Sequence, residues 1–342
     1  MAAARKHEFR RVMHEHHQRL NRLIDRRGAE ELKRLYDRAH GEQLKQLRAH
    51  MRRLGGDSFS AYQARVVLAQ LKAGQAALSA RLAGEIIDLA NEAQRESLRG
   101  LAIAIERLEP SFKGAEVRIR LEEAARFAGI LDERRTSIVR AKREEAEEAA
   151  DSMRAGRRSI PERVKGTLER YSVETIGKLE DELAVSALNA ETPLQAMSRV
   201  EEFVDGDWYR AERIVRTETA WASNATARDG MAAASEELPD LMMQWSEYCE
   251  ADGEPLDDRV GVDSIAMHGQ LAPPDGMFTC PPTAPYPDEH GETRVSKGLA
   301  GEQWEHPPNR PNDRSALAPW RRDWELPGWK WQGNRRIWLV RQ

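Results

Sequence analysis

The sequence has 342 residues, enough for two or more domains with a sizeable core. Its 53 Lys and Arg nearly balance 57 Asp and Glu, and the net charge of −4 excludes a uniformly basic nucleic-acid-binding protein. Hydrophobic residues make up 40% and charged residues 32% of the chain, a mixture too apolar for a disordered chain and too charged for a membrane protein. Two cysteines allow one disulfide at most, and the N-terminus lacks the apolar core of a secretory signal, so we expect a reducing, intracellular place of assembly.

Proline and tryptophan divide the chain into two parts. Thirteen of the 16 prolines follow residue 236, and only two of the nine tryptophans precede it. Because proline breaks helices, the first two-thirds can be helical and the last third mostly cannot. We therefore expect a mainly α protein: an elongated helical body with long hairpins over residues 1–205, and a small loop-rich α+β domain over 206–342.

Apolar residues in the first part recur at helical spacing and form two narrow stripes. Such stripes, with charge on the other faces, favour helical hairpins or coiled-coil packing. The first stripe comprises Leu32, Leu35, Ala39, Leu44, Leu47, Met51 and Leu54. The second comprises Leu71, Leu78, Leu82, Ile86, Leu89 and Ala93. Gly55-Gly56 is expected to end the first helix and Pro110 the second.

Later helices are marked mainly by their start signals. A third helix is expected from about Ala115 to Ala155. Ser159 with Glu162, and Thr192 with Gln195, both fit the capping box, in which side chains bind otherwise unpaired amide groups at a helix start. A further helix is expected to begin near Asp207 and to run through Trp221 towards Ala234.

Charge is distributed unevenly along the chain. Residues 1–54 carry 15 Lys and Arg against 7 Asp and Glu, whereas residues 236–292 carry 14 acidic residues and one Arg. The tail, residues 318–342, is basic again and rich in tryptophan. Segments of opposite charge indicate either partners of different charge or head-to-tail contact between copies of the chain.

Candidate chemical sites are weak in this sequence. His14 and His17 share a helix face but lack further ligands for zinc, and a basic solvated face is the simpler interpretation. Acidic residues from 252 to 263 (Asp252, Glu254, Asp257, Asp258 and Asp263) do not reproduce a calcium-binding loop. Neither Cys249 nor Cys280 lies in a nucleophile motif, so we expect no enzyme and no cofactor.

The segment RAERIVRTETAWASNATARDG combines charged and apolar residues on one helix. Arg213 and Arg216 are three residues apart and share a face, beside Glu218. Partly buried Arg–Glu pairs are costly to separate. We interpret these pairs as structural groups that orient the packing of the C-terminal domain rather than as catalytic groups.

The same segment resembles the opening helix of the Mu F-like minor head protein (head-morphogenesis) family of tailed phages. The resemblance runs over about residues 207–320, with matching pieces in the same order. These are Arg213, Arg216, Glu218, Asn224, Trp245, Asp258, Arg259, His306 and Pro307. No single piece is specific, and the order of the pieces carries the resemblance.

The four cysteines of that family fall on residues that bind metal poorly or not at all, namely Gly261, Ser264, Asn309 and Pro311. The departure implies that this chain has no zinc site. We expect burial of aromatic rings to stabilise the domain instead. The candidate rings are Trp245, Trp304, Trp320, Trp324, Trp329, Trp331 and Trp338. The tryptophans nearest the C-terminus could instead be surface anchors for a partner.

The resemblance implies a structural protein of the virion, located at the portal or the capsid interior and in the host cytoplasm during assembly. Its expected partners are the portal protein and/or the major capsid protein, and packaged DNA is a further candidate partner. The protein is expected in multiple copies per virion. Six arginines near the N-terminus are candidates for contact with DNA or portal: Arg10, Arg11, Arg19, Arg22, Arg26 and Arg27. The alternatives are an enzyme or toxin-type module on the same scaffold, or a nucleic-acid-binding protein.

Overall fold

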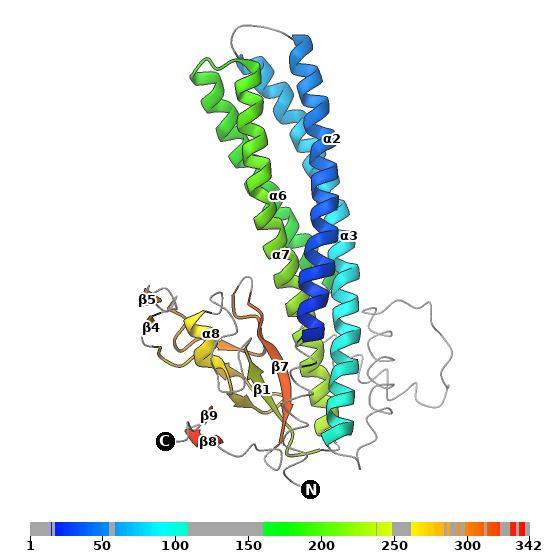
Figure 1. Ribbon diagram of the computed structural model, residues 1–342, viewed down its shortest axis with the longest axis vertical. Coiled ribbons are helices and arrows are strands. Elements are labelled where there is room, and N and C mark those ends of the chain that lie inside the picture. The colour runs from blue at the N-terminus through cyan, green and yellow to red at the C-terminus, as the bar shows by residue number, and fades with distance from the viewer. Residues whose placement is uncertain are drawn as a thin grey trace, which may run out of the picture. The chain divides into compact units, whose positions relative to one another are not determined.

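The computed structural model describes twelve stretches of the chain. They are residue 15 and residues 18–54, 59–108, 160–236, 238–247, 261–283, 286–287, 293–294, 298–310, 313–321, 329–332 and 335–338. The protein is mainly helical, with small antiparallel sheets near the C-terminus, as expected from the proline distribution (Figure 1). None of the described helices is long and apolar enough to cross a membrane.

Long helices dominate the described residues. They are η1 (Leu23–Ala29, a π-helix), α2 (Glu30–Leu54), α3 (Ala61–Leu108), α6 (Ile160–Leu188) and α7 (Pro193–Ser235), followed by the short α8 (Val262–Met267). The strands are β1 (Met242–Ser246), β2 (Leu271–Ala272), β3 (Phe278–Thr279), β4 (Tyr286–Pro287), β5 (Thr293–Arg294), β6 (Gln303–Trp304), β7 (Ala316–Trp320), β8 (Trp329–Gln332) and β9 (Arg335–Trp338).

The chain divides into two compact units, each built from segments that are distant in sequence. The bundle unit comprises Asp25–Leu89 and Ile160–Arg216. The sheet unit comprises the described residues up to Ile24, those from Ala90 to Leu108, and those from Thr217 onwards. This division differs from the expected boundary at residues 205 and 206, because α3 and α7 are long enough to contribute residues to both units.

In the bundle unit α2, α3, α6 and α7 run alongside one another as two antiparallel hairpins (Figure 1). The buried positions of α3 repeat every 11 residues, with successive spacings of 4, 4 and 3. These positions are Val67, Leu71, Gln75, Leu78, Leu82, Ile86, Leu89, Ala93, Ser97, Gly100 and Ala104. An 11-residue repeat corresponds to about 3.67 residues per turn, so each helix keeps one face buried with little supercoiling.

The same spacing governs α7, where polar residues also occupy buried positions. Buried residues at this spacing are Ala196, Val200, Val204, Asp207, Ala211, Val215, Glu218, Ala222 and Thr226. The prediction of a new helix that begins near Asp207 is wrong, because α7 begins at Pro193 and continues to Ser235. Gly206 does not break it, because the buried face continues on both sides with unchanged spacing.

One expected helix start is confirmed. The described part of α2 reaches Leu54 and that of α3 reaches Leu108, whereas Gly55-Gly56 and Pro110, which were expected to end these helices, lie outside the described residues. The Thr192 amide donates to Gln195 Oε1 at 2.8 Å and the Gln195 amide donates to Thr192 Oγ1 at 3.3 Å, which is the predicted capping box. Ser159 and the expected helix from 115 to 155 lie outside the described residues.

A buried polar cluster lies in the core of the bundle unit. Asp207 accepts hydrogen bonds from Tyr171 Oη at 2.5 Å, from Thr175 Oγ1 at 3.1 Å and from Arg210 at 3.1 Å. Tyr36 packs nearby and donates to the carbonyl of Val204 at 3.0 Å. Burial, followed by the neighbouring Tyr36 and the Asp207 carboxylate, raises the pKa of Tyr171 far above the ordinary tyrosine value.

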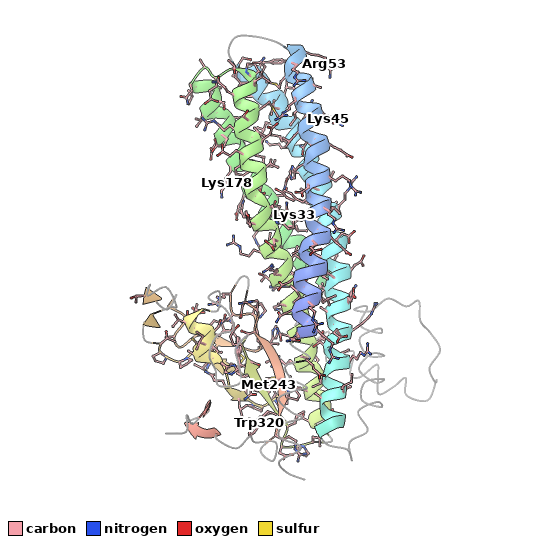
Figure 2. The ribbon with its side chains drawn as sticks, viewed as in Figure 1. Lys33, Lys45, Arg53, Lys178, Met243 and Trp320 are labelled. Carbon is pink, nitrogen blue, oxygen red and sulfur yellow. The ribbon has the colours of Figure 1, made fainter. Side chains whose placement is uncertain are left out.

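The core of the sheet unit lies around the three-stranded sheet β2-β1-β7, with β1 in the centre. Trp245 on β1 is fully buried and meets Phe278 edge to face, with ring centroids 5.3 Å apart. Trp320 is buried in the same cluster and Trp304 packs against it (Figure 2 labels Trp320). The expected burial is confirmed for Trp245 and Trp320. Trp324 and the side chains of Trp329, Trp331 and Trp338 lie outside the described part of the structure.

Removing the Tyr171 hydroxyl tests the buried cluster. We expect Tyr171→Phe to lower the free energy of unfolding by about 1.5–3 kcal/mol at pH 8, because Asp207 loses a donor in a buried site. The pKa of Tyr171 is higher in the folded than in the unfolded chain, so the protonated hydroxyl stabilises the fold. This contribution to the free energy of unfolding is fully present below pH ~10, the ordinary tyrosine pKa, and is lost as the pH rises further. The difference between parent and variant should therefore shrink above pH ~10 in denaturant titrations.

The matched control is Tyr209→Phe, which removes a hydroxyl from a side chain that is 72% exposed on the same helix as Asp207. That variant should stay within about 0.5 kcal/mol of the parent. A Tyr171→Phe difference that stays constant from pH 8 to pH 11 would contradict the assignment of a raised pKa.

Candidate functional site

Asn224, one of the residues that carry the resemblance, is buried between α7 and β7. Its Oδ1 accepts from the Leu317 amide at 2.8 Å, and its Nδ2 donates to the Ser315 carbonyl at 3.0 Å. The C=O of residue 315 and the N–H of residue 317 point to the same side of the strand, as they do when a neighbouring strand binds them. The Asn224 carboxamide therefore takes the place of the N–H and C=O that one residue of a further strand would present.

A network of acidic and hydroxyl groups continues from this junction. Ser315 Oγ lies 2.5 Å from Glu247 Oε2 and 2.6 Å from Asp313 Oδ1. Both carboxylates are buried, each about 2% exposed. Asp313 also accepts from the amides of Ser315 at 2.9 Å and Asn309 at 3.0 Å. We call Asn224, Glu247, Asp313 and Ser315 the junction cluster.

His268 joins the junction cluster from the end of α8. Its Nδ1 accepts a hydrogen bond from the Glu247 amide at 3.1 Å, so the ring carries its proton on Nε2. The cluster thus links α7, the end of β1, the end of α8 and the segment before β7. Most of these contacts bind main-chain groups to side chains, and the Ser315 hydroxyl joins the two carboxylates, which is the chemistry of a structural cross-link.

The other signature residues of α7 also serve packing. Arg216 is mostly buried and pairs with Glu212 at 2.8 Å and with Asp25 at 3.4 Å, both within the bundle unit. Glu218 is 4% exposed, whereas Arg213 is exposed. Arg216 thus forms ion pairs with Glu212 and Asp25 of the bundle unit, and the expectation that the pairs of this segment orient the packing of the C-terminal domain stays a prediction.

The segment around His306 packs on the same helix. The His306 ring meets Trp221 edge to face at 5.6 Å between centroids, and its Nδ1 lies 2.5 Å from the Pro307 carbonyl oxygen. Next to it, Glu305 pairs with Arg228 of α7 at 2.6 Å. Asp258 and Arg259, which complete the signature, lie outside the described residues.

The positions where the family has cysteines converge in part. Gly261 and Ser264 are one turn apart at the start of α8, and Asn309 is next to Arg310. A Cβ on Gly261 would lie 1.7 Å from Arg310 Nη1, so a guanidinium fills the space beside this glycine. Pro311 lies outside the described residues, and among those described no group of three or more His, Cys, Asp or Glu could hold a metal ion.

Cys280 is buried in the core of the sheet unit. Burial, and then the carboxylates of Asp263 and Glu302, raise the pKa of its thiol to about 11. The thiolate, which is the reactive form, is therefore scarce at neutral pH. Cys249, His14, His17 and the acidic residues Asp252, Glu254 and Asp257 lie outside the described residues.

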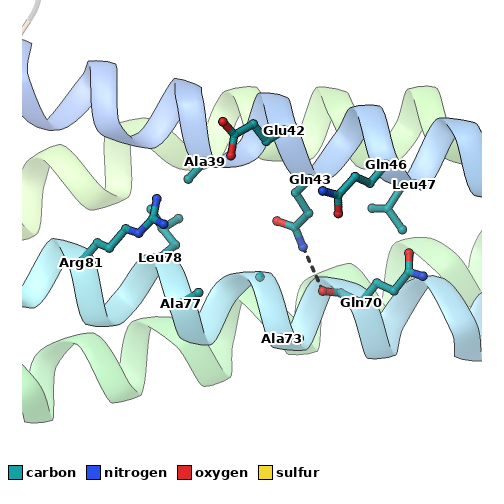
Figure 3. A pocket seen from close by; sticks show the side chains of 11 residues that line it. Ala39, Glu42, Gln43, Gln46, Leu47, Gln70, Ala73, Ala77, Leu78 and Arg81 are labelled. Atoms are coloured by element: carbon teal, nitrogen blue, oxygen red, sulfur yellow. Dashed lines mark hydrogen bonds between the residues drawn. The ribbon is translucent and has the colours of Figure 1, made fainter.

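A groove of about 370 Å³ lies between α2 and α3 (Figure 3). Gln43 crosses it and donates to the carbonyl of Gln70 at 3.1 Å, and Gly74 makes room for this amide, since a Cβ there would lie 2.2 Å from Gln43 Nε2. Its only charged lining residues are Glu42 and Arg81. The lining contains no nucleophile paired with a base, so the groove has no catalytic set.

Of the six N-terminal arginines, the structure describes the side chains of two. Arg19 pairs with Glu96 at 3.1 Å, and Arg22 is exposed and binds Gln18. Leu20 and Ile24, beside them, are buried against Ala220. Arg10 and Arg11 and the side chains of Arg26 and Arg27 lie outside the described residues, so contact with DNA stays a prediction for which Arg22 is the exposed candidate.

Sequence reasoning missed Glu247, Asp313 and Ser315. Each is a single polar residue in a turn-rich region with no spacing motif, and 68 residues separate Glu247 from Ser315. The sequence signal closest to this cluster was the resemblance, which includes Asn224 but does not indicate which groups the Asn224 side chain binds.

Comparisons with known proteins give this chain no relative: no family model, no curated protein and no solved structure matches it.

Replacing Asn224 tests the junction cluster. We expect Asn224→Ala to lower the free energy of unfolding by about 2–5 kcal/mol, because the Leu317 N–H and the Ser315 C=O are left buried without partners. Asn224→Asp should be at least as damaging, because aspartate supplies an acceptor where Ser315 needs a donor. Denaturant titration of the full chain measures both.

Asn91→Ala is the matched control, since Asn91 is a partly buried asparagine on α3 for which the structure records no side-chain hydrogen bond with a described residue. It should change stability by less than about 0.5 kcal/mol. Equal effects of Asn91→Ala and Asn224→Ala would refute the special role of Asn224.

Proposed function

We propose that this chain is a structural minor head protein of a tailed bacteriophage, which binds the portal and/or the capsid interior and assists head assembly, DNA packaging or ejection. The observation that carries the proposal is the bonding of Asn224 to Ser315 and Leu317. A residue of the segment that resembles the phage family thus joins the C-terminal sheet to a long helix, with both polar atoms of its side chain bonded to the main chain next to β7. Such use of the signature suits a building block better than a catalyst.

The polar residues of the sheet unit support the same proposal. In the described part of that unit, the junction cluster and the ion pair between Glu305 and Arg228 link segments of the unit to one another. The thiol of Cys280 is buried, and its raised pKa disfavours nucleophilic chemistry. We therefore propose a role in assembly that needs no cofactor, with the portal protein or the major capsid protein as partner.

Co-sedimentation tests this function. The purified full chain is mixed with portal rings, and separately with empty procapsids, both prepared from the genome that encodes it. We expect stoichiometric co-sedimentation with at least one of the two particles. Heat-unfolded chain is the control for trapping, and binding to neither particle would contradict the proposal.

Comparing the results with portal rings and with procapsids also indicates where in the phage head the protein binds. Binding to isolated portal rings indicates a portal-bound role, whereas binding only to procapsids indicates a role at the shell interior. Binding at similar strength to unrelated capsids of other phages would count against a specific assembly role.

A further inference from the structure

Exposed apolar side chains gather at one end of the bundle unit. Among the described residues seven large hydrophobic side chains are exposed, and four of them flank the two turns of the bundle. These four are Tyr62, Val185, Leu188 and Leu194, which are exposed by 69%, 40%, 85% and 58%. We call them the tip patch.

The two turns that carry the tip patch are hydrogen-bonded to each other. The Phe59 amide, just before α3, donates to the carbonyl of Glu191, between α6 and α7, at 2.5 Å. Tyr62 lies three residues after Phe59, and Leu188 and Leu194 lie three residues on either side of Glu191. Val185 is one turn before Leu188 on the same face of α6. The four side chains therefore belong to one end of the bundle, where both turns lie (Figure 1).

The core does not account for these side chains. The buried face of α6 near its end is formed by Leu179, Leu183 and Ser186, whereas Val185 and Leu188 point away from it. Burying a leucine or valine side chain is worth about 1.5–3 kcal/mol. Exposed apolar side chains grouped at one end of a bundle favour a site for another macromolecule.

Charges of both signs border the tip patch. Residues 25–89, the α2–α3 hairpin, carry 12 Lys and Arg against 8 Asp and Glu, whereas residues 160–216, the α6–α7 hairpin, carry 8 against 12. The hairpins therefore have net charges of +4 and −4. At the tip the basic hairpin exposes Arg52 and Arg53 in the last turn of α2, and Figure 2 labels Arg53 at this end.

The acidic hairpin exposes Glu180 and Asp181 near the end of α6. Two other acids nearby, Glu182 and Glu191, both pair with Arg199, at 3.2 Å and 2.7 Å. By contrast Arg52, Glu180 and Asp181 form no ion pair with any described residue. Unpaired charges of opposite sign thus lie on the two hairpins that meet at the tip patch.

We propose that the tip patch binds a second copy of this chain across a two-fold axis. In a two-fold pair the same surface of both copies is used, so the basic end of α2 faces the acidic segment of α6 of the partner twice. A nucleic acid or an anionic membrane would favour a surface of one positive sign, whereas this surface is mixed and self-complementary. The proposal does not depend on the function proposed above, because its test needs the purified chain alone.

Analytical ultracentrifugation of the full chain tests the apolar part. We expect a monomer–dimer equilibrium, and Leu188→Glu should raise the dimer dissociation constant at least about tenfold, since it puts a charge at the centre of the interface. The matched control is Val173→Glu, on the same helix, where the side chain is 73% exposed outside the patch. It should dimerise like the parent.

Thermal unfolding followed by circular dichroism checks that both variants fold, which we expect because neither side chain is buried. A parent chain that remains monomeric up to about 100 μM, above the dissociation constants of weak specific complexes, would overturn the proposal. So would equal dimerisation of Leu188→Glu and Val173→Glu.

A charge-exchange experiment tests the two-fold geometry. One variant carries Arg52→Glu and Arg53→Glu, and the other carries Glu180→Lys and Asp181→Lys. Each variant alone should be monomeric, because the end of α2 and the facing segment of the partner's α6 then carry charges of the same sign and repel each other. An equimolar mixture should form a heterodimer with affinity near that of the parent. Dimers of either variant alone, or a mixture that stays monomeric, would overturn the two-fold pairing.

Discussion

An edge strand needs partners for its outward-facing backbone groups, and this need organises the sheet unit. β7 lies at the edge of the sheet β2-β1-β7, is buried along its length, and pairs with β1 on one side only. On the other side Asn224 binds the N–H of Leu317 and the C=O of Ser315. A side-chain amide presents an N–H and a C=O side by side in one plane, much as one residue of a neighbouring strand does with its own N–H and C=O. The helix α7 thereby closes the open edge of the sheet, which would otherwise be a template for aggregation.

The helices show what hydrophobic periodicity can predict and where it fails. The stripe from Leu71 to Ala93 lies on the buried face of α3, because apolar residues there recur at helical spacing. The stripe predicted for α2 does not include Tyr36 and His40, although both are buried. A search for apolar residues passes over such polar side chains, which a core can accommodate through hydrogen bonds or ring contacts. The break expected near Asp207 had the same origin, because a buried aspartate bonded to Tyr171 interrupts an apolar pattern without interrupting the helix.

The candidate site was predictable only where it lies on a regular element. Asn224 and Arg216 stand on a helix within a recognisable segment, and their structural role could be expected from the sequence. Glu247, Asp313 and Ser315 come together only through the pairing of β1 with β7, which no local pattern encodes. Their contacts depend on folding of the whole unit. Local signals, in contrast, were sufficient for the Thr192 cap, and the same pattern at Ser60 and Gln63 could have been found.

The central claim is that the Asn224 side chain replaces a neighbouring strand along β7. Hydrogen exchange of the Leu317 amide measures this most directly, because that amide has Asn224 Oδ1 as its partner and no strand on that side. The account predicts that it exchanges as slowly as amides within the β1–β7 ladder, by opening of the whole sheet unit. Exchange of the Leu317 amide at the rate of an exposed loop, with the ladder still protected, would contradict the account.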